Sequence, residues 1–262
     1  MPIRHYGGLT FATTLAVGRL NTPSSGAATP SSVLASNLAI EYDPARGQTL
    51  NGAEIDSLAC QVSGHVISAA AAANRPAYTA SDASFGGFPS FTSSSTGSDG
   101  LFSAAAHGSD LIASGASPYQ AWLGMFIGAA TPATRTVWRL YSAASLSAPY
   151  TAQRVGTTGV LQHLTNNVIT DLNTPTADAV HLFELIYDGS GNLEFWQDNV
   201  LIEENATAAA ASAVRRVCMG ARGDNTGHID AKHGYLIATH SAPTAQQRTD
   251  LLPFWRARGA PV

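Results

Sequence analysis

Hydrophobic and polar positions alternate most regularly between residues 180 and 204. Val180 to Tyr187 has the apolar content of a strand, and two similar runs follow it at 193–197 and 200–204. Turn residues separate these runs, Asp-Gly-Ser-Gly-Asn at 188–192 and Asp198-Asn199. Glycine, aspartate and asparagine tolerate the positive φ angles that tight hairpin turns need. The pattern therefore predicts a three-stranded antiparallel meander.

Short apolar runs between turn residues continue along most of the chain. Ala121 to Ile127 is almost continuously apolar, as expected for a central strand that is covered on both faces. Residues 63–100 predict mostly loop, with extended pieces at 77–80 and 90–92. Further strands are predicted at 38–43, 136–142, 150–155, 160–165, 168–172, 214–221 and 234–239. Many short strands without alternating helices favour a sandwich or barrel, and we expect an all-β, two-layer antiparallel jelly-roll-like sandwich.

The two ends of the chain depart from this strand pattern. After Pro243, Thr244 can cap a short C-terminal helix with Leu251 and Trp255 on its apolar face. Pro253 lies inside this helix and predicts a kink or an end there. Residues 1–32 are expected to form an N-terminal arm and a Pro/Ser/Gly/Ala-rich linker, and residues 33–262 the β-sandwich domain.

The N-terminal arm is too polar to fold by itself, and such arms become ordered when they dock on a neighbour. Arg4, Tyr6, Leu9 and Phe11 are its candidate assembly anchors. Residues 1–22 also allow a secretion signal, because a short apolar run at 9–17 follows Arg4 and His5. Glycine and threonine residues interrupt that run, and we prefer the extended arm.

Composition narrows the range of partners. Hydrophobic residues make up 45% of the 262 residues, enough for a sizeable core, while charged residues make up only 12%. A weakly charged exterior suits packing against other subunits, as a homo-oligomer or multi-copy assembly, although a surface that faces a glycan would have the same composition. The net charge of −4 without a basic run argues against nucleic acid. No apolar stretch approaches the roughly 20 residues that span a bilayer, so no membrane partner is expected.

Two cysteines, Cys60 and Cys218, lie far apart in the sequence. Two buried thiols are the preferred interpretation, and a single disulfide stays open. The four tryptophans all lie in strand or helix patterns and are predicted to be core residues: Trp122, Trp138, Trp196 and Trp255.

Several short motifs occur in an order that resembles a known family. They are Leu-Ala-Ile-Glu-Tyr-Asp-Pro-Ala-Arg at 38–46, Asn-Arg-Pro-Ala-Tyr at 74–78, Phe-Gly-Gly-Phe-Pro-Ser-Phe at 85–91, Phe-Glu-Leu-Ile-Tyr-Asp-Gly at 183–189, and the closing segments at 219–221, 234–238 and 254–259. Together they resemble the concanavalin A-like (laminin-G-like) lectin/glucanase domains of bacteriophage virion and bacterial surface proteins, over about residues 35–260. This resemblance implies a concanavalin A-like sandwich.

Some relatives of that fold hydrolyse glycans with acids at alternate positions of one strand, which places the carboxylates on one sheet face. Glu41-x-Asp43-x-x-Arg46 is the nearest match, but an arginine stands at the last acidic position. We therefore expect that the chain is not an enzyme and has no catalytic residues.

Metal and cofactor sites are not expected either. His228, Asp230 and His233 could lie close together, but no fourth metal ligand is apparent. Asp224-Asn225 leaves calcium open, with a simple Asx turn as the preferred interpretation.

These observations lead to two hypotheses about function. The first is a non-catalytic structural or adhesion component of a phage-like virion, a head decoration, tail-fibre or baseplate protein anchored by its arm. Its partners would be other virion proteins, and its location the virion, assembled in the host cytoplasm and then extracellular. The alternative is a lectin-like module that binds a cell-surface glycan; the ligand-binding residues of such a module are not apparent from the sequence.

Overall fold

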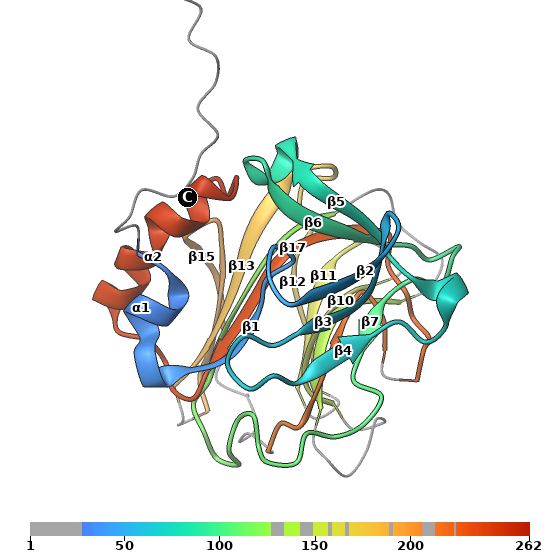
Figure 1. Ribbon diagram of the computed structural model, residues 1–262. Coiled ribbons are helices and arrows are strands. Elements are labelled where there is room, and N and C mark those ends of the chain that lie inside the picture. The colour runs from blue at the N-terminus through green and yellow to red at the C-terminus, as the bar shows by residue number, and fades with distance from the viewer. Residues whose placement is uncertain are drawn as a thin grey trace, which may run out of the picture.

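The computed structural model describes residues 28–126, 134–141, 149–156, 159–165, 168–188, 191–205, 213–222 and 224–262. These residues form an all-β fold of antiparallel strands with two helices at one side (Figure 1). None of the described helices is long and apolar enough to cross a membrane.

The first layer of strands is centred on β8 (Tyr119–Phe126) and β17 (Ala231–Thr239), which pair along most of their length. β13 (Val180–Tyr187), β14 (Leu193–Gln197) and β15 (Val200–Asn205) continue the layer beyond β8. These last three strands are the predicted meander. On the other side of β17, β1 (Leu38–Tyr42) pairs with its second half and β6 (Phe88–Ser93) with its first half.

The second layer follows from β6 without a break in the hydrogen-bonded network. β5 (Ala77–Asp82) joins β6 to β3 (Glu54–Ala59), which also pairs with β2 (Gln48–Asn51) and β4 (Val66–Ser68). β7 (Leu101–Phe102), β16 (Arg216–Met219) and β9 (Arg135–Tyr141) come next. β10 (Pro149–Val155), β11 (Leu161–Thr165) and β12 (Val168–Asn173) complete the order.

This continuity corrects the expected architecture in part. The antiparallel all-β class and the C-terminal helix are confirmed. The two layers, however, are joined through β5 and β6 into one nearly closed, barrel-like sheet, rather than forming a clear two-layer jelly-roll sandwich. Alternation along single strands could not show this, because pairing between β3 and β5 or β6 and β17 is decided by distant segments.

Two hydrophobic clusters hold the layers together. The larger lies between the layers and contains Trp122, Trp138 and Phe183. The smaller lies on the outer face of the first layer, where Leu251 and Trp255 of the C-terminal helix pack on it. β8 and β17 are therefore covered on both faces, which the apolar run at 121–127 predicted for β8.

Local sequence explains the tight turns and the thiols. Asp198 and Asn199 have φ angles of 53° and 64°, so the β14–β15 hairpin has two left-handed residues, as in an Asn-Gly turn. Cys60 and Cys218 are both buried free thiols, which confirms the preferred interpretation.

Two helices cover the outer face of the first layer (Figure 1). α1 (Pro30–Leu34) contains the expected boundary between linker and domain at residue 32, and the division into an arm and a domain stays a prediction. Three short 3-10 segments also occur, at Ala35–Asn37, Ala72–Asn74 and Ala83–Phe85. The region 63–100 holds β4, β5 and β6 and thus more strand than predicted, because alanine and serine carry a weak strand signal.

The C-terminal helix α2 spans Ala245–Ala257 and continues past Pro253, so the predicted end at Pro253 is wrong. Proline removes one hydrogen bond of the helix. Burial of Leu251 before Pro253, and of Phe254 and Trp255 after it, fixes both halves of α2 to the sheet and outweighs this loss.

The N-terminus of α2 has a capping box that generates a prediction. Thr244 Oγ1 accepts a hydrogen bond from the Gln247 backbone N–H at 3.2 Å, and Gln247 Oε1 accepts one from the Thr244 N–H at 2.9 Å. Thr244→Ala should lower the free energy of unfolding by about 1 kcal/mol in denaturant titrations. Thr249→Ala, on the exposed face of α2, is the matched control and should be neutral or slightly stabilising. Equal effects of the two variants would contradict the capping role.

Candidate functional site

Two acids, Glu41 in β1 and Asp43 directly after it, lie on the helix-covered face of the first layer. Ile40 and Tyr42 point into the core between the layers, so the alternate residues Glu41 and Asp43 face the other way. Both acids are buried, at 2% and 3% exposure. The carboxylates that the sequence singled out are thus on one face, below α2.

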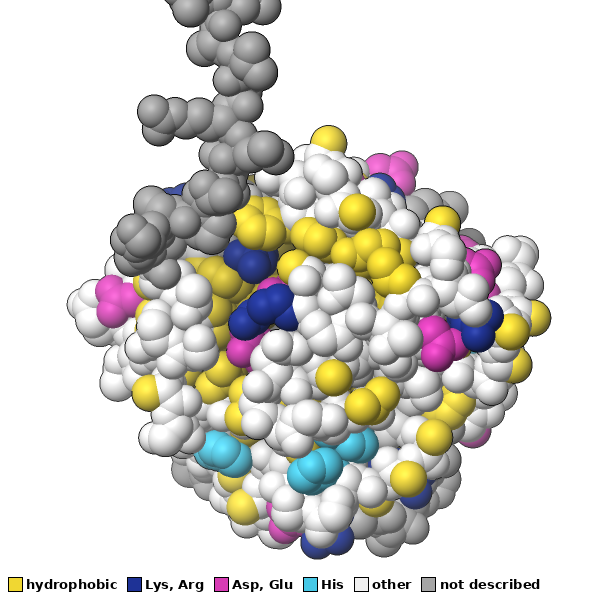
Figure 2. Space-filling view, viewed as in Figure 1, with side chains coloured by type: hydrophobic (Ala, Val, Ile, Leu, Met, Phe, Trp, Pro, Cys, Tyr) yellow, Lys and Arg dark blue, Asp and Glu magenta, His cyan; other side chains and the backbone are white. Residues whose placement is uncertain are grey.

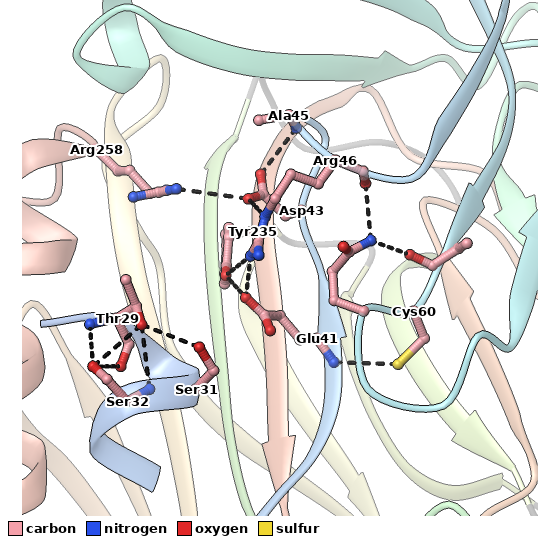
Figure 3. Close-up of polar contacts among 12 residues, drawn as sticks. Thr29, Ser31, Ser32, Glu41, Asp43, Ala45, Arg46, Cys60, Tyr235 and Arg258 are labelled. Atoms are coloured by element: carbon pink, nitrogen blue, oxygen red, sulfur yellow. Dashed lines mark hydrogen bonds and ion pairs between the residues drawn. The ribbon is translucent and has the colours of Figure 1, made fainter. Parts of the chain in front are cut away.

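Arg46 connects the two carboxylates (Figure 3). Its Nε donates to Asp43 Oδ2 at 2.8 Å, and its Nη2 donates to Glu41 Oε1 and to the Tyr235 hydroxyl. Tyr235 Oη also donates to Glu41 Oε1. The turn after β1 makes this geometry, because the Ala45 N–H donates to Asp43 Oδ1 at 2.9 Å and returns the chain toward the strand.

A second arginine approaches Asp43 from the end of α2. Arg258 Nη2 lies 3.7 Å from Asp43 Oδ2. Its guanidinium carbon lies 4.2 Å from the ring centre of Phe88 and 3.9 Å from that of Phe254. Cation–π contact therefore holds Arg258 between two aromatic rings with its charge directed at Asp43.

These residues line a pocket of about 320 Å³ between α1, α2 and the turn after β1. Its apolar walls come from Ala45, Phe88, Pro253, Phe254 and Ala257, and its polar lining from Thr29, Ser31, Asp43, Arg46 and Arg258. Figure 2 shows basic side chains beside a band of hydrophobic side chains on this face. An apolar pocket with a few convergent polar groups is typical of small-molecule sites, and this volume is at the lower end of their range.

Burial and charge shift the proton affinities around the pocket. Burial opposes the charge of Arg46, but the hydrogen bond to Asp43 and the neighbouring carboxylate of Glu41 outweigh it and raise its pKa. Burial, with the charges of Glu41 and Asp43, raises the pKa of Tyr235 well above its usual range. Tyr235 is therefore a neutral hydrogen-bond donor at neutral pH. Burial lowers the pKa of Arg258, although Asp43 counteracts it.

The arrangement can accept and donate hydrogen bonds at the same place. Asp43 is an acceptor, and Arg46, whose side chain is 48% exposed, lines the pocket beside it with its guanidinium donors. In their ion pairs both carboxylates act as acceptors, which suits a nucleophile, a base or a ligand for hydroxyl groups. A general acid, by contrast, must hold a proton to donate.

Two buried serine–histidine pairs are structural contacts. His233 Nε2 lies 2.9 Å from Ser93 Oγ, and His65 Nε2 lies 2.6 Å from Ser103 Oγ. Both serines also donate to backbone carbonyls. Burial lowers the pKa of His65 to about 4, with His107 adding to the effect, and that of His233 to about 3.

The metal-ligating candidates point in different directions. His228 contacts the backbone carbonyls of Asp99 and Asn225, while Asp230 accepts from Ser95. Within the described parts of the chain no group of three or more such side chains could hold a metal ion. At the position left open for calcium, Asp224 pairs with Arg222 at 3.3 Å and accepts from Thr226. Asp224 also accepts a hydrogen bond from the backbone N–H of Thr226, as in an Asx turn, and Arg222 balances its charge.

The remaining sequence candidates have simple outcomes. Trp122, Trp138 and Trp255 are buried, as predicted, whereas Trp196 is half-buried with Arg248 4.2 Å above its ring. Arg4, Tyr6, Leu9 and Phe11 lie outside the described residues. Phe88 and Arg258 were missed, because nothing in their local patterns indicates that α2 ends beside β6. The spacing of Glu41, Asp43 and Arg46 was the one signal that led to the site.

No protein-family model matches the sequence, and no curated protein is significantly similar to it. Solved structures are similar in fold. Domain 4 of AbnA, a GH43 extracellular arabinanase from Geobacillus stearothermophilus, solved with arabinotriose, has a TM-score of 0.56 at 12% identity, covering 82% of this chain and 98% of that one.

Two larger proteins show the same similarity. An arabinofuranosidase complexed with arabinofuranosyl-α-1,2-xylobiose has a TM-score of 0.59 at 11% identity, with 78% of this chain and 51% of that chain covered. A Trypanosoma rangeli sialidase with the inhibitor DANA has a TM-score of 0.51 at 7% identity, with 81% and 32% covered. The chain thus spans about half of the first enzyme and about a third of the second.

These similarities correct several expectations. The resemblance to concanavalin A-like, laminin-G-like phage domains is wrong, since the neighbours belong to an arabinanase, an arabinofuranosidase and a sialidase. The virion role, whether as decoration, tail-fibre or baseplate protein, is contradicted by the same structural neighbours. The exclusion of enzymes is also contradicted, because the fold occurs in glycoside hydrolases. Motifs such as Tyr-Asp-Gly mark hairpin turns, which many antiparallel folds share. The expected virion partners and location are not tested by these comparisons.

Arg46 provides a direct test of the ion-pair cluster. Arg46→Met would leave the buried Glu41 and Asp43 without their shared partner and should lower the free energy of unfolding by about 2 to 3 kcal/mol. Arg75→Met is the control, because its partner Asp56 is 43% exposed, and should cost under about 1 kcal/mol. Chemical denaturation measures both. Equal losses would mean that the cluster adds little.

The histidine shift predicts acid sensitivity. An unfolded histidine binds its proton near pH 6.5, whereas folded His233 does so near pH 3, so the stability from neutral His233 is complete above pH 6.5 and declines below it. The expected loss between pH 7 and pH 5 is about 2 kcal/mol. Denaturant unfolding should show a smaller loss for His233→Gln, while His240→Gln, at an exposed position, should behave as the wild type. Identical pH dependence in all three proteins would refute this origin.

Proposed function

We propose that this chain is a carbohydrate-active domain that binds a sugar residue in the pocket lined by Asp43, Arg46, Arg258 and Phe88. The observation that carries the proposal is the convergence of a buried carboxylate, two guanidinium groups and an aromatic ring in one pocket of about 320 Å³.

Sugars need this combination of groups. Each hydroxyl both donates and accepts a hydrogen bond, and Asp43 accepts while Arg46 and Arg258 donate. The C–H face of a sugar ring packs on aromatic surface, which Phe88 offers at the pocket wall. Since the ion pairs already fix Asp43 and Arg46, little side-chain entropy is lost on binding.

The similar fold of domain 4 of the arabinanase, solved with arabinotriose, makes pentose oligosaccharides the first ligands to test. The polysaccharide would then be the partner of this domain, whether free or on a cell surface.

Glycoside hydrolysis is a second candidate, favoured by the placement of two carboxylates on one face of β1. Glycosidases use two carboxyl groups flanking the scissile bond. Asp43 lines the pocket and would act as base or nucleophile, with Glu41 behind it held by Arg46 and Tyr235.

Calorimetric titration with arabinotriose and xylotriose tests the binding proposal. Asp43→Asn and Phe88→Ala should each weaken binding by about tenfold or more, because a charged hydrogen-bond acceptor or the ring face is lost. Asp56→Asn, on β3 and 43% exposed on its side chain, is the matched control and should bind as the wild type. Thermal unfolding of each variant separates lost binding from lost folding.

The same proteins test hydrolysis by product analysis of these oligosaccharides. Release of arabinose or xylose that disappears in Asp43→Asn would support the second candidate. If the wild type neither binds nor cleaves the oligosaccharides at millimolar concentration, the pocket is not a pentose site. Unchanged affinity in Asp43→Asn and Phe88→Ala would place binding elsewhere.

A further inference from the structure

A second group of basic side chains lies on the outer face of the second layer. Arg139 of β9 stands opposite Ala152 of β10, and Arg154 of β10 stands opposite Thr136 of β9. Residues 152 and 154 share a sheet face, so Arg139 and Arg154 lie on the same side of neighbouring strands.

A β-bulge makes this arrangement. The register between β9 and β10 shifts after Gln153, so that Val137 and Trp138 together oppose one residue of β10. Both belong to the core between the layers. Thr136 and Arg139, on either side of the bulge, are therefore left on the outer face.

Arg222 approaches the same place from the turn after β16. The Thr136 N–H donates to the Gly227 carbonyl at 2.7 Å, which ties this turn to β9. A side chain at Gly227 would meet Arg222 Cδ at 2.9 Å, so the glycine makes room for the arginine stem beside Thr136. Burial and the charges of Arg139 and Arg222 lower the pKa of Arg154, which is consistent with the placement of both arginines near it.

The counter-charges within the described residues do not balance these cations. Arg222 pairs with Asp224 at 3.3 Å, and Arg154 reaches Asp171 only through Gln162. Arg139 is only 5% exposed, yet its Nε has no hydrogen-bond partner among the residues described. Cys218 faces Arg139 across the β9–β16 pairing, but burial raises the pKa of its thiol to about 12, so it stays neutral.

Burial of a guanidinium whose Nε has no hydrogen-bond partner costs free energy unless another interaction compensates for the lost hydration. Arginine offers a planar fork of N–H donors that matches a carboxylate with two parallel hydrogen bonds. The three arginines carry three positive charges, and Asp171 and Asp224 carry two negative ones, so one positive charge is not balanced by these carboxylates.

We propose that Arg139, Arg154 and Arg222 form a second binding site, which takes the carboxylate of an acidic sugar residue such as a uronic acid. The carboxylate follows from the arginine cluster. The choice of a sugar over an acidic peptide rests on the proposed function. This site lies on the second layer, separate from the Asp43 pocket on the first, so each can be tested alone.

Calorimetric titration with glucuronic acid, glucose and a triglutamate peptide tests the site. Glucuronic acid should bind at least tenfold more tightly than glucose, and Arg139→Gln should reduce this affinity by about 10- to 100-fold. Arg256→Gln, on the exposed part of α2, removes the same charge elsewhere and should bind as the wild type. Asp43→Asn should also keep glucuronic acid binding, even if it loses the pentose oligosaccharides.

The melting temperature without ligand separates a binding role from a structural one. Arg139→Gln should leave it unchanged or raise it, since a buried charge is removed, whereas an arginine needed for folding would lower it. Equal affinity for glucuronic acid and glucose, tighter binding of triglutamate, or unchanged glucuronic acid binding in Arg139→Gln would each overturn the proposal.

Discussion

Burial of β8 and β17 on both faces is the constraint on which the rest of this fold depends. One face of these strands packs against the second layer, and the other must be covered by something else. The helix α2 supplies that cover through Leu251, Phe254 and Trp255. Because this apolar contact holds α2 on both sides of Pro253, the helix continues past the proline and brings Arg258 to Asp43.

The Asp43 pocket is a consequence of where this cover ends. The helix ends at Ala257, and the residues that lie on this face of β1 and of the turn after it, Glu41 and Asp43, are acidic. Two buried carboxylates would be strongly unfavourable alone, and Arg46 and Arg258 compensate their charge. The same groups that make burial of the acids tolerable also line an opening, so stability and ligand recognition share the same ion pairs.

The two proposed sites use opposite electrostatic designs. In the Asp43 pocket the charges are paired, which leaves polar groups that suit neutral hydroxyls. On the outer face of the second layer the arginines exceed their partners, which suits an anion. A chain with only 12% charged residues thus concentrates several of them at two places, while most of its surface is uncharged.

The sequence by itself determined β1 and most strands from β8 onward, the meander at 180–204, the capped C-terminal helix and the shared face of Glu41 and Asp43, because these depend on periodicity and turn residues close in the chain. It did not determine that β5 and β6 join the layers, that Pro253 is tolerated, or that Phe88 and Arg258 meet Asp43. Those outcomes arise from pairing and packing between segments that are separated in the sequence, as between β6 and β17 or between Asp43 and Arg258. A local sequence pattern does not specify which distant segment will pack on it, so only the tertiary structure decides these contacts.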